Sequence, residues 1–237
     1  MSTARDDILG RIRSARGRGA DGAATEALAA RLQAHPRHLI PARTQGLDQA
    51  QRAALFARFA VAANATMAHV AQAADVPAAV AQYLAEHNLP ARVVMTSDMR
   101  LDRYPWPGAP LLTIRRGVAA ADDAVSVSAA FAAIAETGTL VLISGPDTPT
   151  TNNFLPETHI VVLEAAQIVG AYEDAWDRLR QARSDAGGAA MPRTVNLVTG
   201  PSRTADIAQR LELGAHGPRR LHIVLVEAED GGAAAER

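Results

Sequence analysis

The chain has 237 residues, of which 48% are hydrophobic and 4% aromatic, which is enough to bury the core of one large domain. Its formal net charge is −1, so the composition argues against a nucleic-acid-binding surface. The absence of cysteine excludes disulfides, thiolate catalysis and any iron–sulfur cluster held by cysteines of this chain.

Residues 1–45 are expected to form a helical arm that is partly flexible, because helical pieces flank an Arg/Gly/Ala-rich stretch and no strand pattern occurs. The first residues lack the apolar core of a signal peptide, and no apolar run reaches the roughly 18–20 residues that span a bilayer. We therefore expect a cytoplasmic protein without a membrane span. His35 and His38 lie in this arm without a further ligand nearby, so we predict no bound metal.

Two helices are predicted after the arm. Asp48, followed three residues later by Gln51, has the spacing of a capping box, and apolar positions at helical spacing extend this helix to Val70. Asp75 and Pro77 mark the start of the second helix.

The pattern then changes to short apolar runs bounded by Gly, Pro, Asp or Asn, which are typical of β-strands. These runs lie at residues 91–96, 111–114, 124–127, 139–143 and 159–163. A helix at 171–181 and a strand, helix and strand at 195–229 complete the pattern. Strands that are apolar on both faces and alternate with helices predict an α/β three-layer sandwich with a largely parallel sheet. This domain is expected over residues 46–228, with a flexible tail at 229–237.

Glu136 lies between two apolar stretches, directly before Thr137, Gly138 and Thr139. A carboxylate at such a position is costly to bury unless it is hydrogen-bonded or faces a cleft, so Glu136 could act as an acid, base or nucleophile. It could equally accept hydrogen bonds from the amides of a tight turn for which Gly138 supplies an unusual dihedral angle. The sequence leaves both interpretations open, and the three following residues are predicted to line a binding site.

The segment 145–162 follows a predicted strand and is rich in hydroxyl and amide side chains, as binding loops often are. Asn152 and Asn153 are predicted to contact a polar small molecule. His159, at the start of the next strand, is a candidate catalytic residue, although a histidine at a strand edge is more often structural.

The junction after the strand at 195–198 is the strongest predicted binding site. Ser202 or Thr204 is expected to cap a following helix, whose free amides attract anions. Arg203 adds a guanidinium suited to carboxylate or phosphate, and open α/β sheets bind ligands at the carboxyl edge of their strands. Alternatively, Arg203 pairs with Asp206 and the hydroxyls only cap the helix. A cap does not require an arginine, so we favour binding, by the set Gly200, Pro201, Ser202, Arg203, Thr204 and Asp206.

A loop after this predicted helix carries His216. Gly214 is expected to end the helix, and Gly217 with Pro218 to shape the loop that presents His216 before the last strand. His216 is therefore a further candidate catalytic residue.

Taken together, these residues resemble the lactate utilization protein C family, which is built on the LUD domain. The resemblance covers roughly residues 45–228. It rests on AETGT at 135–139, on Leu155, Pro156 and His159, and above all on GPSRTADI at 200–207 followed by Gly214, His216, Gly217 and Pro218. It implies a fold similar to the sugar-isomerase and CoA-transferase superfamily.

The resemblance also implies a role in the oxidation of L-lactate to pyruvate, together with two partner proteins of the iron–sulfur type. The iron–sulfur clusters are expected in the partner proteins, with no cofactor assigned to this chain, and its expected ligand is a small carboxylate or an anionic cofactor. Two alternatives of other classes stay open. One is an assembly protein without chemistry, whose arm docks the partners. The other is a CoA- or nucleotide-dependent transferase or ligase that acts alone.

Overall fold

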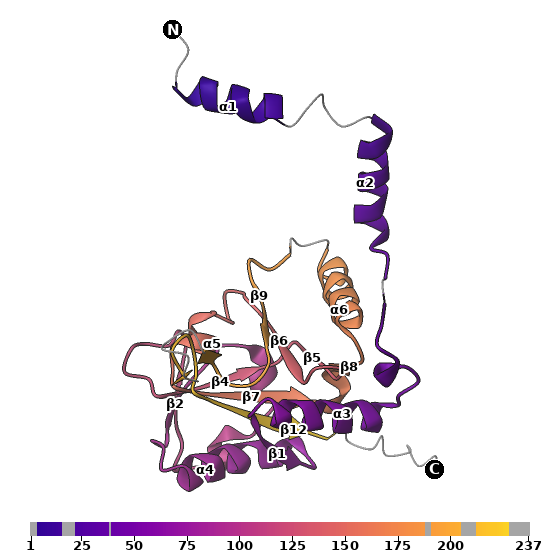
Figure 1. The fold of residues 1–237 in the computed structure, drawn as a ribbon. Helices are drawn as coiled ribbons and strands as arrows, with labels where there is room; N and C mark the ends of the chain where they lie inside the picture. The colour runs from indigo at the N-terminus through magenta and orange to yellow at the C-terminus, as the bar shows by residue number, and fades with distance from the viewer. Residues whose placement is uncertain (1–3, 16–21, 38, 188–190, 205–211, 228–237) are drawn as a thin grey trace. The chain divides into compact units, whose positions relative to one another are not determined.

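The computed structural model describes residues 4–15, 22–37, 39–187, 191–204 and 212–227 (Figure 1). By its internal contacts the chain divides into two units, Met1–Leu39 and Ile40–Arg237. The predicted tail at 229–237 and Asp206 lie outside the described residues.

The first unit contains two helices, α1 (Ala4–Ala15) and α2 (Gly22–Ala34). Acidic residues stand in the first turn of α1 and Arg13 in its last turn, as the helix dipole favours. No residue of α1 is buried. Four large apolar side chains of the two helices are exposed, namely Ile8, Ile12, Leu28 and Leu32.

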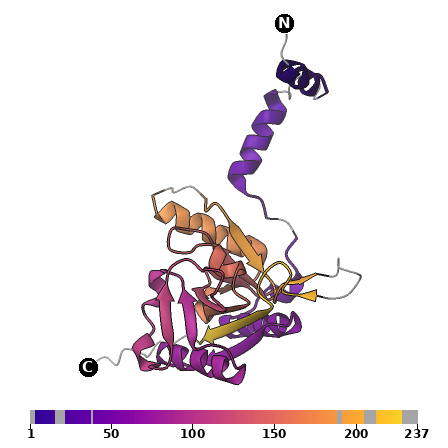
Figure 2. The same ribbon diagram turned by 90° about the vertical axis from the view of Figure 1, so that its left-hand side faces the viewer.

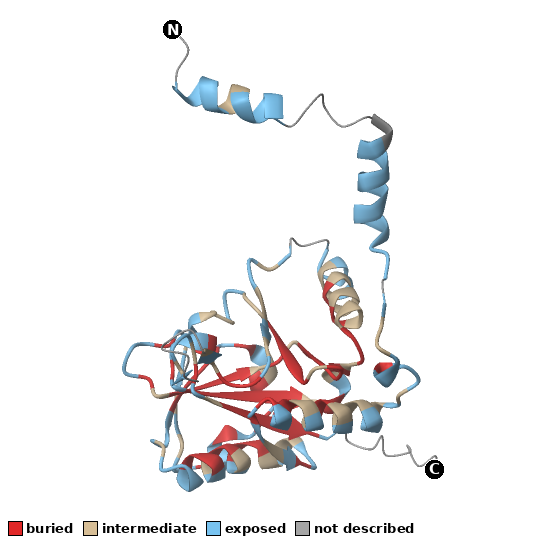
Figure 3. Ribbon diagram, in the orientation of Figure 1, coloured by how far each residue is buried: buried red, intermediate tan, exposed pale blue. Residues whose placement is uncertain are grey.

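The second unit is built on a six-stranded sheet with the order β1-β12-β7-β4-β2-β3. Every neighbouring pair in it is parallel. Its strands are β1 (Thr66–Val70), β2 (Arg92–Met95), β3 (Thr113–Arg116), β4 (Val125–Ala129), β7 (Thr158–Glu164) and β12 (Arg220–Val226). The central strands are buried (red in Figure 3), as expected for strands covered on both faces. The predicted α/β fold with a largely parallel sheet is confirmed.

Helices α3 (Gln49–Ala62) and α4 (Val76–Glu86) cover opposite faces of this sheet. Along β7, Ile160 and Val162 pack in the core beneath α4, while Val161 and Leu163 pack in the core beneath α3. The capping box that begins α3 is formed as predicted, because the Asp48 carboxylate accepts from the Gln51 amide at 2.8 Å.

A second, four-stranded sheet has the order β8-β5-β6-β9. It consists of β5 (Ala132–Ile134), β6 (Thr139–Ile143), β8 (Ile168–Val169) and β9 (Val195–Val198), and it is mixed, with β6 antiparallel to both neighbours. One face shares the core of α3, and the other is covered by α6 (Tyr172–Asp185). The expectation that 139–143 and 195–198 join the parallel sheet is therefore wrong.

Short elements connect these layers. They are α5 (Thr151–Phe154) and the 3-10 turns η1 (Ala42–Thr44), η2 (Ala73–Asp75), η3 (Met99–Leu101), η4 (Trp106–Gly108) and η5 (Ala165–Gln167). The helix expected to reach Val70 ends at Ala62 instead, and Asn64 follows with a φ of 69°. Apolar residues three apart fit a helix, but here Met67 and Val70 lie in strand β1 because β12 offers it a hydrogen-bonding partner.

The helix predicted after Pro201 is wrong at both ends. Arg203–Thr204 forms β10, which pairs antiparallel with β11 (Glu212–Leu213), seen at the right of Figure 2. The residues between these strands lie outside the described residues. Ser202 and Gly214, which the sequence analysis placed at the two ends of a helix, therefore flank two paired strands. The turn-forming residues that suggested a helix cap also favour hairpins, and here cross-strand pairing takes up the backbone groups.

Candidate functional site

A cavity of about 380 Å³ brings together much of the predicted binding set. Its walls come from the carboxyl end of β9, the loop that follows it, the connection from β11 to β12, and the first residues of β7 and β12. The predicted site residues that line it are Asn153, His159, Gly200, Pro201, Ser202, Arg203 and His216.

This cavity lies at the amino ends of the parallel strands. His159 and Leu221, which both line it, are each the second residue of a strand of the large sheet. The cavity also lies at the carboxyl end of β9, as the sequence analysis predicted for the strand at 195–198, but β9 belongs to the smaller sheet.

The loop after β9 owes its shape to close contact with α3. Gly200 has a φ of 71°, and a Cβ atom there would lie 2.0 Å from the carbonyl oxygen of Ala63. Only glycine fits this position without displacing the helix end. The loop carries Pro201, Ser202 and Arg203 directly beyond this contact, which positions them at the cavity.

Ser202 ties the two loops of the cavity together. Its amide donates to the carbonyl of Pro218 at 2.8 Å, and its own carbonyl accepts from the Gly214 amide at 2.9 Å. Its hydroxyl accepts from the amide of His216 at 3.2 Å. These three backbone amides are therefore used within the protein.

The charge of the cavity favours an anion. Arg203 is exposed and forms no ion pair with any described residue, and His216 is exposed beside it. No aspartate or glutamate occurs among the described lining residues. A free guanidinium without a competing carboxylate suits a carboxylate or phosphate ligand. The alternative pairing of Arg203 with Asp206 falls outside the described residues.

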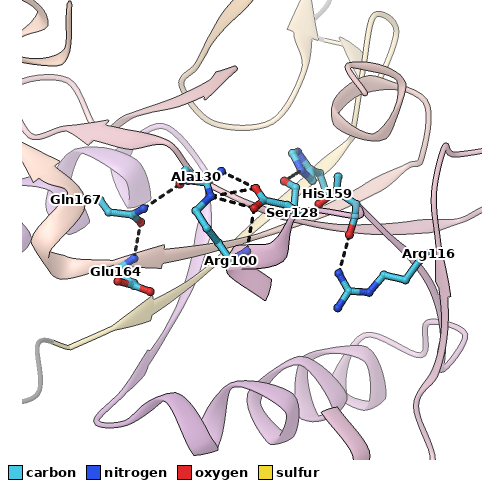
Figure 4. A network of polar contacts seen from close by, with 9 residues as sticks. Arg100, Arg116, Ser128, Ala130, His159, Glu164 and Gln167 are labelled. Atoms are coloured by element: carbon cyan, nitrogen blue, oxygen red, sulfur yellow. Dashed lines mark hydrogen bonds and ion pairs between the residues drawn. The ribbon is translucent and has the colours of Figure 1, made fainter. Parts of the chain in front are cut away.

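His159 forms a buried, neutral part of the wall. It is 1% exposed, and burial lowers the pKa of its imidazole to about 3. Its Nε2 lies 2.7 Å from the Ser128 hydroxyl (Figure 4), and its Nδ1 has no hydrogen-bond partner among the described residues. A neutral imidazole of this kind can form one more hydrogen bond but is a poor base at neutral pH.

Glu136 does not line the cavity. It is 6% exposed, its amide donates to the carbonyl of Gly170 at 3.1 Å, and its Oε1 accepts from the amide of Tyr172 at 3.4 Å. This contact favours the interpretation that the carboxylate holds a turn. Its catalytic role stays a prediction without support from the cavity.

The three residues after Glu136 lie behind the cavity wall. The Thr139 hydroxyl lies 2.6 Å from the hydroxyls of both Thr137 and Thr199, and 3.2 Å from that of Tyr172. A Cβ atom on Gly138 would lie 2.3 Å from an α3 backbone nitrogen. These residues therefore support the cavity wall from behind. Thr199, whose hydroxyl contacts that of Thr139, lines the cavity itself and was missed by the sequence analysis.

Asn152 and Asn153 have separate roles. The Asn152 side chain accepts from the Ala119 amide and donates to the Gly117 carbonyl, both at 2.9 Å, so it holds a neighbouring loop. Asn153 lines the cavity. Thr204, which was also predicted to bind the ligand, does not line it. Phe154 and Leu197 also line it and were missed, because apolar side chains carry no chemical signal in the sequence.

At the carboxyl edge of the parallel sheet, polar side chains pair with one another (Figure 4). Arg100 forms an ion pair with Asp98 at 2.6 Å and donates to the carbonyl of Ala130 at 2.7 Å. Gln167 donates to the same carbonyl and accepts from the amide of Glu164 at 3.0 Å. These contacts brace the strand ends internally. In the described part of the chain, no three side chains gather as a metal site, and no helix is long and apolar enough to cross a bilayer.

Comparison with known proteins places the matching region within the second unit. The family model described as "LUD domain" matches residues 54–226. Lactate utilization protein C of Bacillus subtilis (strain 168) is 39% identical over 93 residues, which cover 39% of this chain and 38% of that protein. Lactate utilization protein C of Geobacillus thermodenitrificans is 35% identical over 114 residues, covering 47% and 46%. The matches thus span less than half of these two relatives.

One solved structure supports the fold. A DUF162 family protein from Deinococcus radiodurans superposes with a TM-score of 0.56 over 76% of this chain and 99% of that one. Its sequence identity is 21%. At this identity the likeness supports the α/β fold and carries no information on ligands.

Proposed function

Because this chain belongs to the LUD domain family, we propose that it takes part in lactate utilisation, as a subunit or accessory component of an L-lactate-oxidising system. Relatives from Bacillus and Geobacillus that carry the name lactate utilization protein C support this role. Since less than half of each of these relatives is matched, the activity of the whole protein is part of the proposal.

The observation that carries a binding role is the exposed guanidinium of Arg203, which forms no ion pair with a described residue, in a cavity whose described lining has no carboxylate. We propose that this arginine pairs with the carboxylate of lactate or pyruvate, or with an anionic cofactor. The cavity volume of about 380 Å³ lies within the range of small-molecule sites, roughly 300–1,000 Å³, and exceeds what lactate alone requires. His159 and Thr199 would offer neutral hydrogen-bonding groups to the same ligand.

The oxidation of lactate to pyruvate removes two electrons and two protons. The chain has no cysteine to ligate an iron–sulfur cluster, so we propose that two iron–sulfur-type partner proteins accept the electrons. His159 is a weak base because its pKa is near 3, so we assign it no proton abstraction. In this proposal the chain binds and orients the anion.

Calorimetric titration of L-lactate, pyruvate and inorganic phosphate into the purified chain tests the binding role. Arg203→Ala should weaken binding of the preferred anion by roughly 10- to 100-fold, the value of one charged hydrogen bond pair. The matched control is Arg193→Ala, which removes an exposed arginine that lies outside this cavity. Equal affinities in the two variants would contradict an anion site at Arg203.

A second candidate function, assembly without chemistry, is favoured by the apolar side chains exposed on α1 and α2. In it, the arm docks the iron–sulfur partners. Affinity purification from lactate-grown cells, with iron quantitation, should then recover partners with the wild type and lose them with Ile8→Ser/Ile12→Ser. Retention of the partners by that variant, with loss in Arg203→Ala, would contradict it.

A further inference from the structure

A groove of about 440 Å³, separate from the cavity, runs between β1 and α4. Residues of β1 form one side, Asp75 and residues of α4 as far as Glu86 form the other, and His222 of β12 also lines it. None of these residues belongs to the candidate anion site.

The strand that forms this groove has a free edge. Among the described strands, β1 pairs only with β12 and ends the sheet. The carbonyl of Val70 accepts from the Glu227 amide at 2.9 Å, so the backbone groups of Val70 face β12. Since backbone polar groups alternate in direction along a strand, those of Met67 and His69 point outward. Both residues line the groove.

The two sides of the groove match in length. The five residues of β1 extend about 16 Å at ~3.3 Å each, and the eleven residues of α4 extend about 16 Å at ~1.5 Å each. Because α4 connects β1 to the parallel strand β2, it runs back alongside β1. The groove therefore accommodates an extended segment of about five residues.

Acidic groups stand at both ends of this groove. Asp75 lies before the first turn of α4 and Glu86 in its last turn, and no lysine or arginine occurs among the described lining residues. His222 is 4% exposed, and burial, assisted by nearby His87, lowers its pKa to about 4, so it adds no positive charge at neutral pH. Its Nδ1 contacts the Thr66 hydroxyl at 2.9 Å, and its Nε2 has no partner among the described residues.

We propose that this groove binds an extended segment of a partner protein, which adds to the free edge of β1 as a further strand and places basic side chains near Asp75 and Glu86. Strand addition supplies backbone hydrogen bonds at Met67 and His69, and the acidic ends select the partner. A second copy of this chain fits less well, because pairing through the same edge brings like-charged Asp75 and Glu86 of both copies together.

The proposal is tested with phage-displayed random heptapeptides selected on the full-length chain. The recovered peptides, labelled with fluorescein, are titrated against two variants of one position. His69→Pro removes an outward backbone amide and leaves the pairing with β12 intact, whereas His69→Ala removes only the side chain. The expected peptides are rich in lysine, arginine and β-branched residues. Their affinity for His69→Ala should stay within about twofold of their affinity for the wild type. Their affinity for His69→Pro should be lower by about tenfold or more, which corresponds to the loss of one to two hydrogen bonds.

A charge variant and two further readouts complete the test. Glu86→Lys should weaken the same peptides several-fold, and added peptide should slow amide hydrogen exchange at Met67 and His69. Circular dichroism of each variant verifies that the fold is retained. Failure to recover any peptide, or equal binding by the two His69 variants, overturns the proposal. A wild-type dimer in sedimentation that His69→Pro dissociates overturns it in favour of a second copy.

Discussion

Two glycine-containing loops, residues 135–139 and 199–203, approach the same end of α3 from different strands of the smaller sheet. Gly138 has a φ of 66°, and a Cβ atom on it would lie 2.3 Å from the backbone nitrogen of Ala60 in α3; Gly200 has a φ of 71°, and its Cβ atom would lie 2.0 Å from the carbonyl oxygen of Ala63, directly after α3. Both loops therefore need glycine for the same reason, which is contact with a helix.

The loops differ in what surrounds the glycine. Thr139 is fully buried and its hydroxyl bonds to other hydroxyls of the protein, whereas Thr199 and Arg203 are exposed at the cavity. The glycine in each loop thus indicates contact with a helix, and only the second loop has exposed polar neighbours that line the cavity. Four predictions distinguish residues that stabilise the fold from residues that bind an anion, and they are given from the largest expected effect on stability to the smallest.

The largest effect is expected from Gly138→Ala. Left-handed backbone strain of about 1–3 kcal/mol adds to overpacking of about 1–3 kcal/mol against α3, so unfolding free energy should fall by roughly 2–6 kcal/mol. The control is Gly46→Ala, where φ is also 70° but nothing lies within 4 Å of the added Cβ, so only the strain applies. Urea denaturation measures both. Similar losses at the two positions would show that contact with α3 contributes little.

The next effect is a loss of stability in acid from the two buried histidines. His159 and His222 have folded pKa values of about 3 and 4, below the unfolded value near 6.5, because burial disfavours the charged ring. The unfolded chain binds more protons between these values. Stability is therefore full above about pH 6.5 and falls by up to about 1.4 kcal/mol per pH unit for each histidine as the pH drops.

Urea denaturation between pH 7 and pH 5 measures this slope before most carboxylates titrate. His159→Gln/His222→Gln should flatten the slope. A slope that is unchanged in the double variant would show that these imidazoles take up protons in the folded protein.

A smaller effect is expected from the hydroxyl cluster behind the cavity. Thr139→Val removes the shared partner of Thr137, Thr199 and Tyr172, and should lower the unfolding free energy by about 1–3 kcal/mol. Thr199→Val should lower it less, because its position is exposed to water. Anion binding, in contrast, should weaken more in Thr199→Val than in Thr139→Val. Thermal denaturation and calorimetry of both variants measure the two effects, and a larger stability loss at Thr199 would contradict the assignment.

The smallest stability effect is expected at Arg203. Because its side chain is exposed and forms no ion pair with a described residue, Arg203→Ala should change the unfolding free energy by less than about 0.5 kcal/mol while it weakens anion binding. Melting curves measured with and without L-lactate show both quantities. A melting temperature that falls in parallel with binding would mean that the arginine supports the fold.

Local signals predicted the elements that depend on neighbouring residues. The capping box of Asp48 and Gln51 marks the start of α3, and the acidic first turn and basic last turn of α6 mark that helix. The junction at 200–203, with His159 and His216, carried enough chemistry to be predicted as a site, and these residues line one cavity. These residues signal a site because arginine and histidine near turn-forming residues are chemically distinctive wherever they lie.

Only the tertiary structure decided which residues face one another. β6 and β9 look like any apolar strands, and their place in a second, mixed sheet depends on partners far away in the chain. For the same reason the cavity lies at the amino ends of the parallel strands, and Glu136 does not line it. The sequence by itself determined the α/β class, the starts of α3, α4 and α6, and the residue types of the 200–203 loop. Strand pairing and burial are long-range properties, so the sheet order, the free edge of β1 and the membership of the cavity came from the fold.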